Sequence, residues 1–172
     1  MSQVLKIIKE RRSVREFQAK ALPADLTEQL IEALLWAPSA GNLQSRKFYF
    51  IYNQSVKEQL VEAAFGQNFL SQAPLVIVAC ADSQIAGRYG ERGKSLYTIC
   101  DVAASIQNLM LVATELGLAS CWVGAFNSEQ VVKILKLTEN LTPIALVPVG
   151  YSAEELTAPR RVDKEQAVKV RK

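Results

Sequence analysis

From about Leu96 to Leu116 the chain is apolar on almost every side of the helix that its residue spacing predicts. A helix of this kind is a central core helix or lies partly in a subunit interface, because no face of it is suited to water. One core built from 172 residues could hardly cover it completely, so we expect both roles together. Its polar exceptions are Asp101, Gln107, Asn108 and Glu115.

The remaining patterns predict several shorter elements in a layered arrangement. Helices are expected before Arg11, then over 24–36, 56–65 and 129–136, the last opened by Asn127. Apolar runs typical of strands cover 48–52, 75–81 and 144–149, the last interrupted by Pro148, and 120–126 is a short strand or an extended turn. The order predicts an α+β fold with a central mixed or antiparallel sheet flanked by helices.

The segment 83–95 holds three glycines and four charged residues. We expect a mobile loop there, either a lid over a site or an ordinary surface loop. Its glycines are evenly spaced and precede a helix, so they do not form the dinucleotide fingerprint of a Rossmann fold.

Length and composition favour a single globular domain over 1–172, with a polar tail from about 151 to 172. Hydrophobic residues make up 49% and charged residues 22%, which argues against disorder. The net charge of +3 is too small to indicate a nucleic-acid partner. Lys6, Lys9 and Glu10 are incompatible with a signal peptide, and no apolar run approaches the roughly 18 residues of a membrane span. We therefore expect a cytoplasmic protein without a membrane partner.

The reactive side chains are few. Cys80, Cys100 and Cys121 lack the paired spacing of a zinc site or redox dithiol, and we expect them to be buried, reduced thiols. The chain has no histidine, which removes histidine-based nucleophile systems and the common histidine-ligated metals. If the protein is an enzyme, we expect a bound organic cofactor to carry the chemistry, with no catalytic side chain and no metal.

Arginines gather near both ends of the chain. Arg11, Arg12 and Arg15 surround Ser13 within five residues, and Arg160-Arg161 stand in the tail. Planar guanidinium groups suit phosphate oxygens, so they could surround one phosphate if the fold brings the two ends together. The alternative is a solvated basic surface.

A polar loop of small residues follows the second expected helix. Within 37–45, Ser39, Asn42, Gln44 and Ser45 offer donors and acceptors with little bulk. The loop is either a plain connector or a binding loop, and a flavin ring edge or ribityl chain would match its groups.

These pieces together resemble the nitroreductase family of FMN-dependent oxidoreductases. The resemblance covers nearly the whole chain, in five stretches whose order and spacing are specific: 11–17 (RRSVREF), 37–44 (APSAGNLQ), 101–109 (DVAASIQNL), 117–126 (GLASCWVGAF) and 159–161 (PRR). It implies an intertwined homodimer with two FMN sites, each built from both subunits at the interface. Arg11, Arg12 and Ser13 would then hold the phosphate and ribityl end, helped by Arg160 or Arg161.

The resemblance assigns the flavin ring to other residues. Arg15 would lie near the pyrimidine side, where a positive charge stabilises the anionic reduced ring. Ser39, Ala40 and Asn42 would reach the flavin from the partner subunit. The backbone amides of Gly124 and Ala125 would lie near the nitrogen that receives hydride, and Gln67 would contact the ring edge.

The implied activity is a two-step transfer. NADH or NADPH would pass hydride to the flavin and leave, and a nitroaromatic, quinone or similar acceptor would take its place. Three alternatives stay open: a flavin storage or sensor protein, a specialised dehalogenase, flavin-fragmenting or azoline-oxidising relative, and a non-flavin protein whose arginines bind another phosphate or a protein. The chain is short for the family and lacks the insertions that shape substrate pockets in larger members, so the acceptor stays open. The preference for NADH or NADPH stays open because no 2′-phosphate clamp can be assigned.

Overall fold

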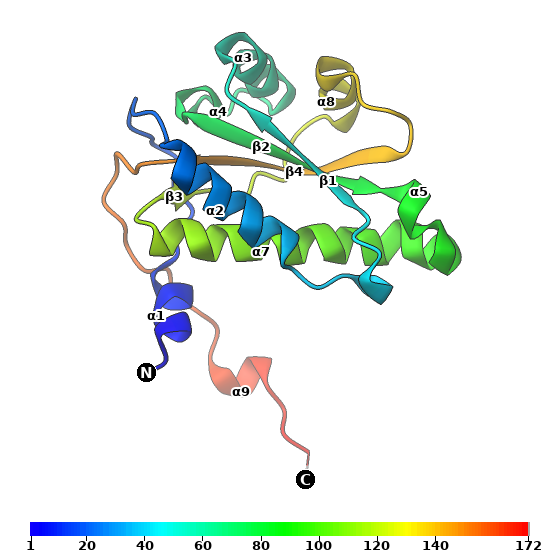
Figure 1. Cartoon of the computed structure of the whole chain (residues 1–172). Helices are drawn as coiled ribbons and strands as arrows, with labels where there is room; N and C mark the ends of the chain where they lie inside the picture. Colours follow the sequence, from blue (N-terminus) through cyan, green and yellow to red (C-terminus); the bar gives the residue numbers. More distant parts are fainter. Residues whose placement is uncertain (172) are drawn as a thin grey trace.

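The computed structural model describes residues 1–171, and a four-stranded antiparallel sheet lies at its centre (Figure 1). The strand order β1-β2-β4-β3 makes β2 and β4 the inner strands. This confirms the predicted α+β class and its antiparallel sheet. The strands are β1 (Arg46–Ile51), β2 (Leu75–Asp82), β3 (Ala119–Ser120) and β4 (Leu141–Gly150).

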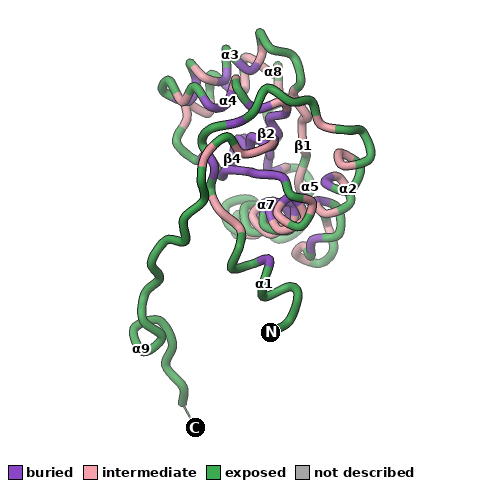
Figure 2. Tube along the Cα trace, turned by 90° about the vertical axis from the view of Figure 1, so that its left-hand side faces the viewer, coloured by how far each residue is buried: buried purple, intermediate pink, exposed green. Residues whose placement is uncertain are grey.

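The strand β2 divides two hydrophobic cores. Val76, Val78 and Cys80 face the first core, while the alternating residues from Leu75 to Ala81 face the second. Successive side chains of a strand point to opposite faces, so a strand covered on both sides must be apolar throughout. The continuous apolar run of the sequence therefore places β2 in the middle, as Figure 2 shows.

Helices cover both faces of the sheet. The first core lies under α3 (Gln54–Ala63), α4 (Phe69–Gln72) and α8 (Ser128–Leu135), and the second under α2 (Ala24–Leu35) and α7 (Thr98–Glu115). The short helix α1 (Gln3–Glu10) packs on α7. These helices occupy the predicted segments except α4, a one-turn helix that was not predicted. Asn127 caps α8 because its Oδ1 accepts the Gln130 N–H at 3.1 Å.

The helix α7 is a core helix with an uncovered side. Val102, Ile106 and Leu109 are buried against the sheet and α2, whereas Ile99 is 40% exposed. The helical stretch Ser83–Glu115 has the length and composition of a membrane span, which corrects the expectation that no run approaches one; 44% of its most apolar window is buried in the chain. Helices at the centre of layered folds share this composition.

The predicted mobile loop at 83–95 is wrong, because this segment consists of helical turns that lead into α7. They are α5 (Ser83–Ala86), η2 (Gly87–Tyr89), α6 (Gly90–Arg92) and η3 (Gly93–Tyr97). Asp82 caps the first turn, with its Oδ1 3.0 Å from the Gln84 nitrogen. At Gly93 a Cβ would lie 2.3 Å from the Ala86 carbonyl oxygen, so glycine permits the close packing here instead of loosening the chain.

Two smaller expectations are also wrong. Pro148 does not interrupt β4, because it stays in register opposite Val76 and its carbonyl accepts the Cys121 N–H at 3.3 Å. Cys100 is exposed while Cys80 and Cys121 are buried, because its position in the first turn of α7 faces away from the sheet.

The two ends of the chain meet beside the sheet. Residues 16–18 pair with 151–153, through Gln18 N–H to Tyr151 O at 2.9 Å and Ala153 N–H to Glu16 O at 2.9 Å. The following tail is exposed and leads to the short helix α9 (Lys164–Ala167), which stands away from the sheet in Figure 1.

Candidate functional site: an arginine-lined cavity

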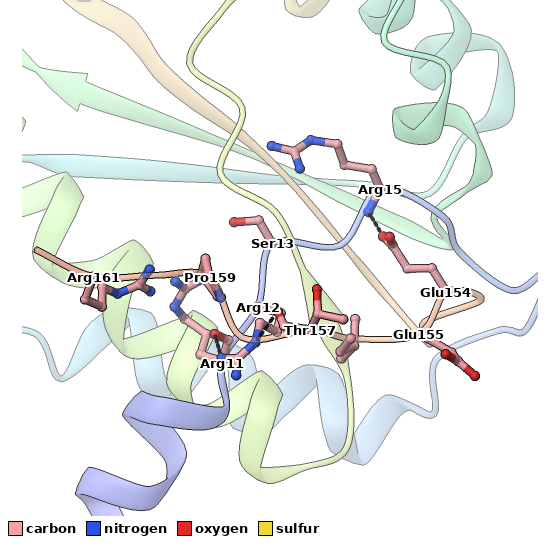
Figure 3. Close-up of a pocket in the computed structure, with 10 residues that line it drawn as sticks. Arg11, Arg12, Ser13, Arg15, Glu154, Glu155, Thr157, Pro159 and Arg161 are labelled. Carbon is pink, nitrogen blue, oxygen red and sulfur yellow. Dashed lines mark hydrogen bonds between the residues drawn. The ribbon is translucent and has the colours of Figure 1, made fainter.

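A cavity of about 370 Å³ opens between the segment after α1 and the tail (Figure 3). The Val14 N–H donates to Ser120 O at 3.0 Å on one side, and the pairing of 16–18 with 151–153 fixes the other. The fold therefore brings the arginines near the two ends of the chain together, as a shared phosphate site requires, and four of the five line one cavity. Its lining is Arg11, Arg12, Ser13, Arg15, Glu154, Glu155, Leu156, Thr157, Pro159 and Arg161.

Arg11 has an unsatisfied donor at this cavity. Among residues 1–171, its Nη1 is the buried side-chain nitrogen that lacks a hydrogen-bond partner. Burial lowers the pKa of Arg11, and the neighbouring charges of Arg161 and Arg12 lower it further. Figure 3 shows the guanidinium groups of Arg11 and Arg161 facing one another. An anion would satisfy the donor and separate the like charges, so these residues fit a phosphate group.

Arg12 is engaged differently. Its Nε donates to Thr157 O at 2.9 Å, and its Nη1 donates to Lys9 O at 2.6 Å and to Arg11 O at 2.8 Å. These bonds fasten the tail to the C-terminal end of α1. Arg12 therefore lines the cavity but uses two of its nitrogens on the chain itself.

Ser13, Arg15 and Glu154 complete the wall, and the sequence did not reveal Glu154 as a site residue. The Arg15 N–H donates to the Glu154 carboxylate, and the Arg15 side chain extends above the cavity in Figure 3. Cys121 lies beneath, where burial raises the pKa of its thiol while Arg15, a hydrogen bond with Ser13 and Arg11 oppose the rise. No local signal in the sequence could have paired Glu154 with Arg15, because the two are 139 residues apart.

The two arginines of the tail differ in the cavities that they line. Arg161 lines the cavity with Arg11, whereas Arg160 lines a neighbouring cavity of about 330 Å³ with Val162, Asp163 and Gln166, which Arg161 also borders. Arg161 is thus the tail residue that can share a ligand with Arg11.

Gln67 and the segment 124–125 form a second polar group. The Gln67 Nε2 donates to Ala125 O at 2.9 Å and to Ala64 O at 3.0 Å. Gly124 and Ala125 are exposed, and the extended chain from Ser120 joins them to the arginine cavity.

Ser39, Ala40 and Asn42 are not brought to the cavity within one chain. Their 3-10 turn η1 (Ala40–Asn42) lies beside the N-terminal half of α7, where the Ala40 N–H donates to Asp101. The helix α1 and the arginines lie toward the other half (Figure 1). Within residues 1–171 no group of acidic or cysteine side chains could hold a metal ion.

Known proteins share this architecture. The NADPH:FMN oxidoreductase of Vibrio harveyi, solved in complex with NAD+, superimposes with a TM-score of 0.91 at 22% identity, over 99% of this chain and 78% of that one. The chain thus has the same fold as that oxidoreductase.

The sequence comparisons give the family itself. The model of the nitroreductase family matches residues 8–70 and 66–151, and the chain belongs to this family. An NADH dehydrogenase of Thermus thermophilus is 33% identical over 92% of this chain and 91% of the relative. An FMN reductase [NAD(P)H] of Bacillus subtilis is 25% identical over 96% of this chain and 72% of the relative.

Proposed function

We propose that the protein is an FMN-dependent oxidoreductase that takes hydride from NADH or NADPH and reduces a small acceptor such as a nitroaromatic or a quinone in two steps. The observation that carries the proposal is the Arg11 Nη1, which is buried at the cavity and finds no partner among the described residues. Relatives named FMN reductase and NADH dehydrogenase support the same cofactor and donor.

The phosphate of FMN would be held by Arg11, Arg161 and Ser13, whose side chains line the cavity. Arg12 would act mainly by fixing Thr157 of the tail and the end of α1. Arg160 is left with the neighbouring cavity, so we assign the phosphate contact of the tail to Arg161.

The flavin ring would then extend from Ser13 toward Gly124. When bound, FMN supplies hydride transfer between the nucleotide and the acceptor. Arg15 would stabilise negative charge on the reduced ring, since its guanidinium extends above the cavity (Figure 3). The exposed backbone at Gly124 and Ala125, together with Gln67, would orient the ring edge.

We also propose that the active form is a homodimer with the cofactor sites at the subunit interface. An apolar groove of about 320 Å³ runs along α1, α2 and α7, and Trp36, which lines it, is 81% exposed. Ser39, Ala40 and Asn42 lie away from the arginine cavity of their own chain, so a second copy would have to supply them. In sedimentation we expect a dimer at micromolar concentration and dissociation of Leu111→Glu, a groove variant; a monomeric wild-type protein would contradict this.

The tail and the location complete the proposal. The whole chain would act as one flavin-binding domain, with the tail from 151 onward over the cofactor site or the partner; Glu154, Thr157 and Arg161 in the cavity wall support the first of these. A cytoplasmic location is supported by Cys80, Cys100 and Cys121, which are free thiols as expected in a reducing compartment.

An absorption spectrum of the purified protein, followed by anaerobic addition of NADH and then NADPH, tests the function. We expect flavin bands that bleach with at least one nucleotide and reappear when a quinone is added. Bands that persist with both nucleotides would favour flavin storage or sensing. A protein that stays colourless after incubation with FMN would contradict the proposal.

A further inference from the structure

The turn that follows α2 has an unusual backbone. Gly41, Asn42 and Gln44 have φ angles of +56°, +54° and +53°. Asn visits this left-handed region at modest cost, whereas Gln carries the full penalty of a side chain there. Residues in such conformations persist only when their surroundings hold them, and they concentrate at ligand-binding sites.

Asp101 holds the turn from below. Its Oδ1 accepts the Ala40 N–H at 2.9 Å, and its Oδ2 accepts the Ser45 hydroxyl at 3.0 Å. The Asp101 residue is 5% exposed and Ser45 is 2% exposed, so the bond between them is shielded from water, while the bond from Ala40 is partly buried. Hydrogen bonds to a buried carboxylate are among the stronger ones in proteins, and this pair joins the two ends of the turn.

Neighbouring side chains secure the flanks. The Arg46 guanidinium donates to Leu35 O at 3.0 Å, Ala37 O at 2.7 Å and Pro38 O at 3.0 Å, which ties the end of α2 to β1. The Thr98 hydroxyl donates to Ser45 O at 2.6 Å. Burial lowers the pKa of Arg46, and the carboxylate of Asp101 opposes this change.

The turn also receives a contact from the segment 83–97. A Cβ added at Gly41 would lie 2.3 Å from the Tyr89 hydroxyl oxygen, so the phenol packs directly on the glycine. A buried carboxylate, a half-buried guanidinium and a phenol thus converge on one short turn. A connector between a helix and an edge strand needs no such set of constraints.

We propose that Asp101 is a positioning residue for the flavin: it holds the Ser39–Asn42 turn in the conformation that contacts the FMN bound by the partner subunit. The inference rests on the proposed function. Asp101 does not touch the cofactor; it acts through Ala40 and Ser45. The turn would meet the ring or ribityl chain, because the phosphate belongs to the arginine cavity.

Two ligands separate this role from phosphate binding. In Asp101→Ala we expect the dissociation constants of FMN and riboflavin to rise by the same factor, about tenfold, the size of one or two lost charge-assisted hydrogen bonds. We also expect a changed visible circular dichroism of the bound flavin. Asp101→Asn can keep both bonds, because its oxygen accepts from Ala40 and its amide donates to Ser45, so its constants should stay within about threefold of wild type.

Asp25→Ala is the matched control. Asp25 lies in the first turn of α2, as Asp101 lies in the first turn of α7, but Asp25 is exposed whereas Asp101 is buried. If Asp101→Ala binds both ligands as tightly as this control, Asp101 is not a positioning residue. A loss confined to FMN would also overturn the proposal, since it would place Asp101 with the phosphate.

A milder variant covers the case in which Asp101→Ala does not fold, as judged by thermal unfolding without flavin. Ser45→Ala removes one bond to the carboxylate, and we expect both constants to rise about threefold; unchanged constants would overturn the proposal. If the wild-type protein binds neither ligand, the proposed function itself fails. If the wild-type protein binds flavin and Asp101→Ala binds it equally well, only the role of Asp101 fails.

Discussion

The arginine cavity and the turn at 39–45 differ in how far their polar groups are satisfied. In the cavity, Arg11 and Arg161 face each other, and the Arg11 Nη1 has no partner from the part of the chain that the structure describes. In the turn, both carboxylate oxygens of Asp101 accept hydrogen bonds. Unpaired like charges favour binding of an anion, whereas a satisfied network stabilises one backbone conformation in advance. The cavity should therefore contribute charge-dependent affinity, and the turn should contribute geometry.

The largest expected effect is on the cavity. Arg11→Ala should raise the dissociation constant of FMN by about 10- to 100-fold, because a charge-assisted bond to phosphate is lost. Riboflavin, which lacks the phosphate, should bind as to wild type. Fluorescence titration with both ligands measures this, and Arg171→Ala, an exposed arginine near the chain end, is the charge-matched control. Equal weakening of both ligands would place Arg11 elsewhere on the flavin.

The next effect is on the turn. Gly41→Ala should destabilise the protein by about 1–2 kcal/mol, because alanine is strained at a φ of +56° and its Cβ meets the Tyr89 hydroxyl. Both FMN and riboflavin should bind several times more weakly. Gly117→Ala has the same type of backbone strain, at φ +71°, but no atom within 4 Å of its Cβ, so it separates strain from the Tyr89 contact. If the two variants lose flavin equally, the contact with Tyr89 has no role.

Arg12 tests whether neighbouring arginines have different tasks. Arg12→Ala should affect FMN less than Arg11→Ala does, because the Nε and Nη1 of Arg12 already bond to backbone carbonyls. It should cost about 1 kcal/mol of stability and expose the tail near Thr157 to limited proteolysis. Thermal unfolding and the rate of tail cleavage measure this. If Arg12→Ala weakens FMN binding as much as Arg11→Ala does, the two arginines do not have different tasks.

Ionic strength should give the smallest effect. Between about 0.05 and 0.5 M salt we expect FMN affinity to fall a few-fold, because ions screen the partly exposed charges of the cavity. Riboflavin affinity should barely change, since it depends on the turn and the ring contacts. A parallel fall for both ligands would indicate that the turn is as charge-dependent as the cavity.

Residue periodicity predicted much of the fold, and the loop predicted after β2 failed because it depends on tertiary contacts. The apolar run at Leu75–Asp82 and the helical spacing before Trp36 specify their elements locally. The segment 83–95 was predicted as a loop because three glycines usually break helices. It is helical because Asp82 caps the first turn and Gly93 packs against Ala86, and the latter contact exists only after the turns have formed.

The sequence predicted which types of residue form the candidate site, but not which hydrogen bonds they make. The sequence indicated a phosphate site made of the arginines near both ends and a polar loop at 37–45. It did not indicate Glu154 in the cavity wall, Cys121 next to that wall, or Asp101 beneath the turn. Glu154 is 139 positions from Arg15, and Asp101 is 61 positions from Ala40 and 56 from Ser45, so local patterns carry no trace of these contacts.

The sequence by itself determined the α+β class, the position of the central strand and the positive charge available for an anion, because these depend on residue type and local spacing. Only the tertiary structure decided which arginine is free to bind. Arg11 and Arg12 are adjacent and chemically identical, yet Arg12 is engaged by Thr157, 145 residues away, while the Nη1 of Arg11 is left without a partner among residues 1–171. Hydrogen-bond satisfaction is a property of the folded surroundings, and it distinguishes two side chains that the sequence presents as equals.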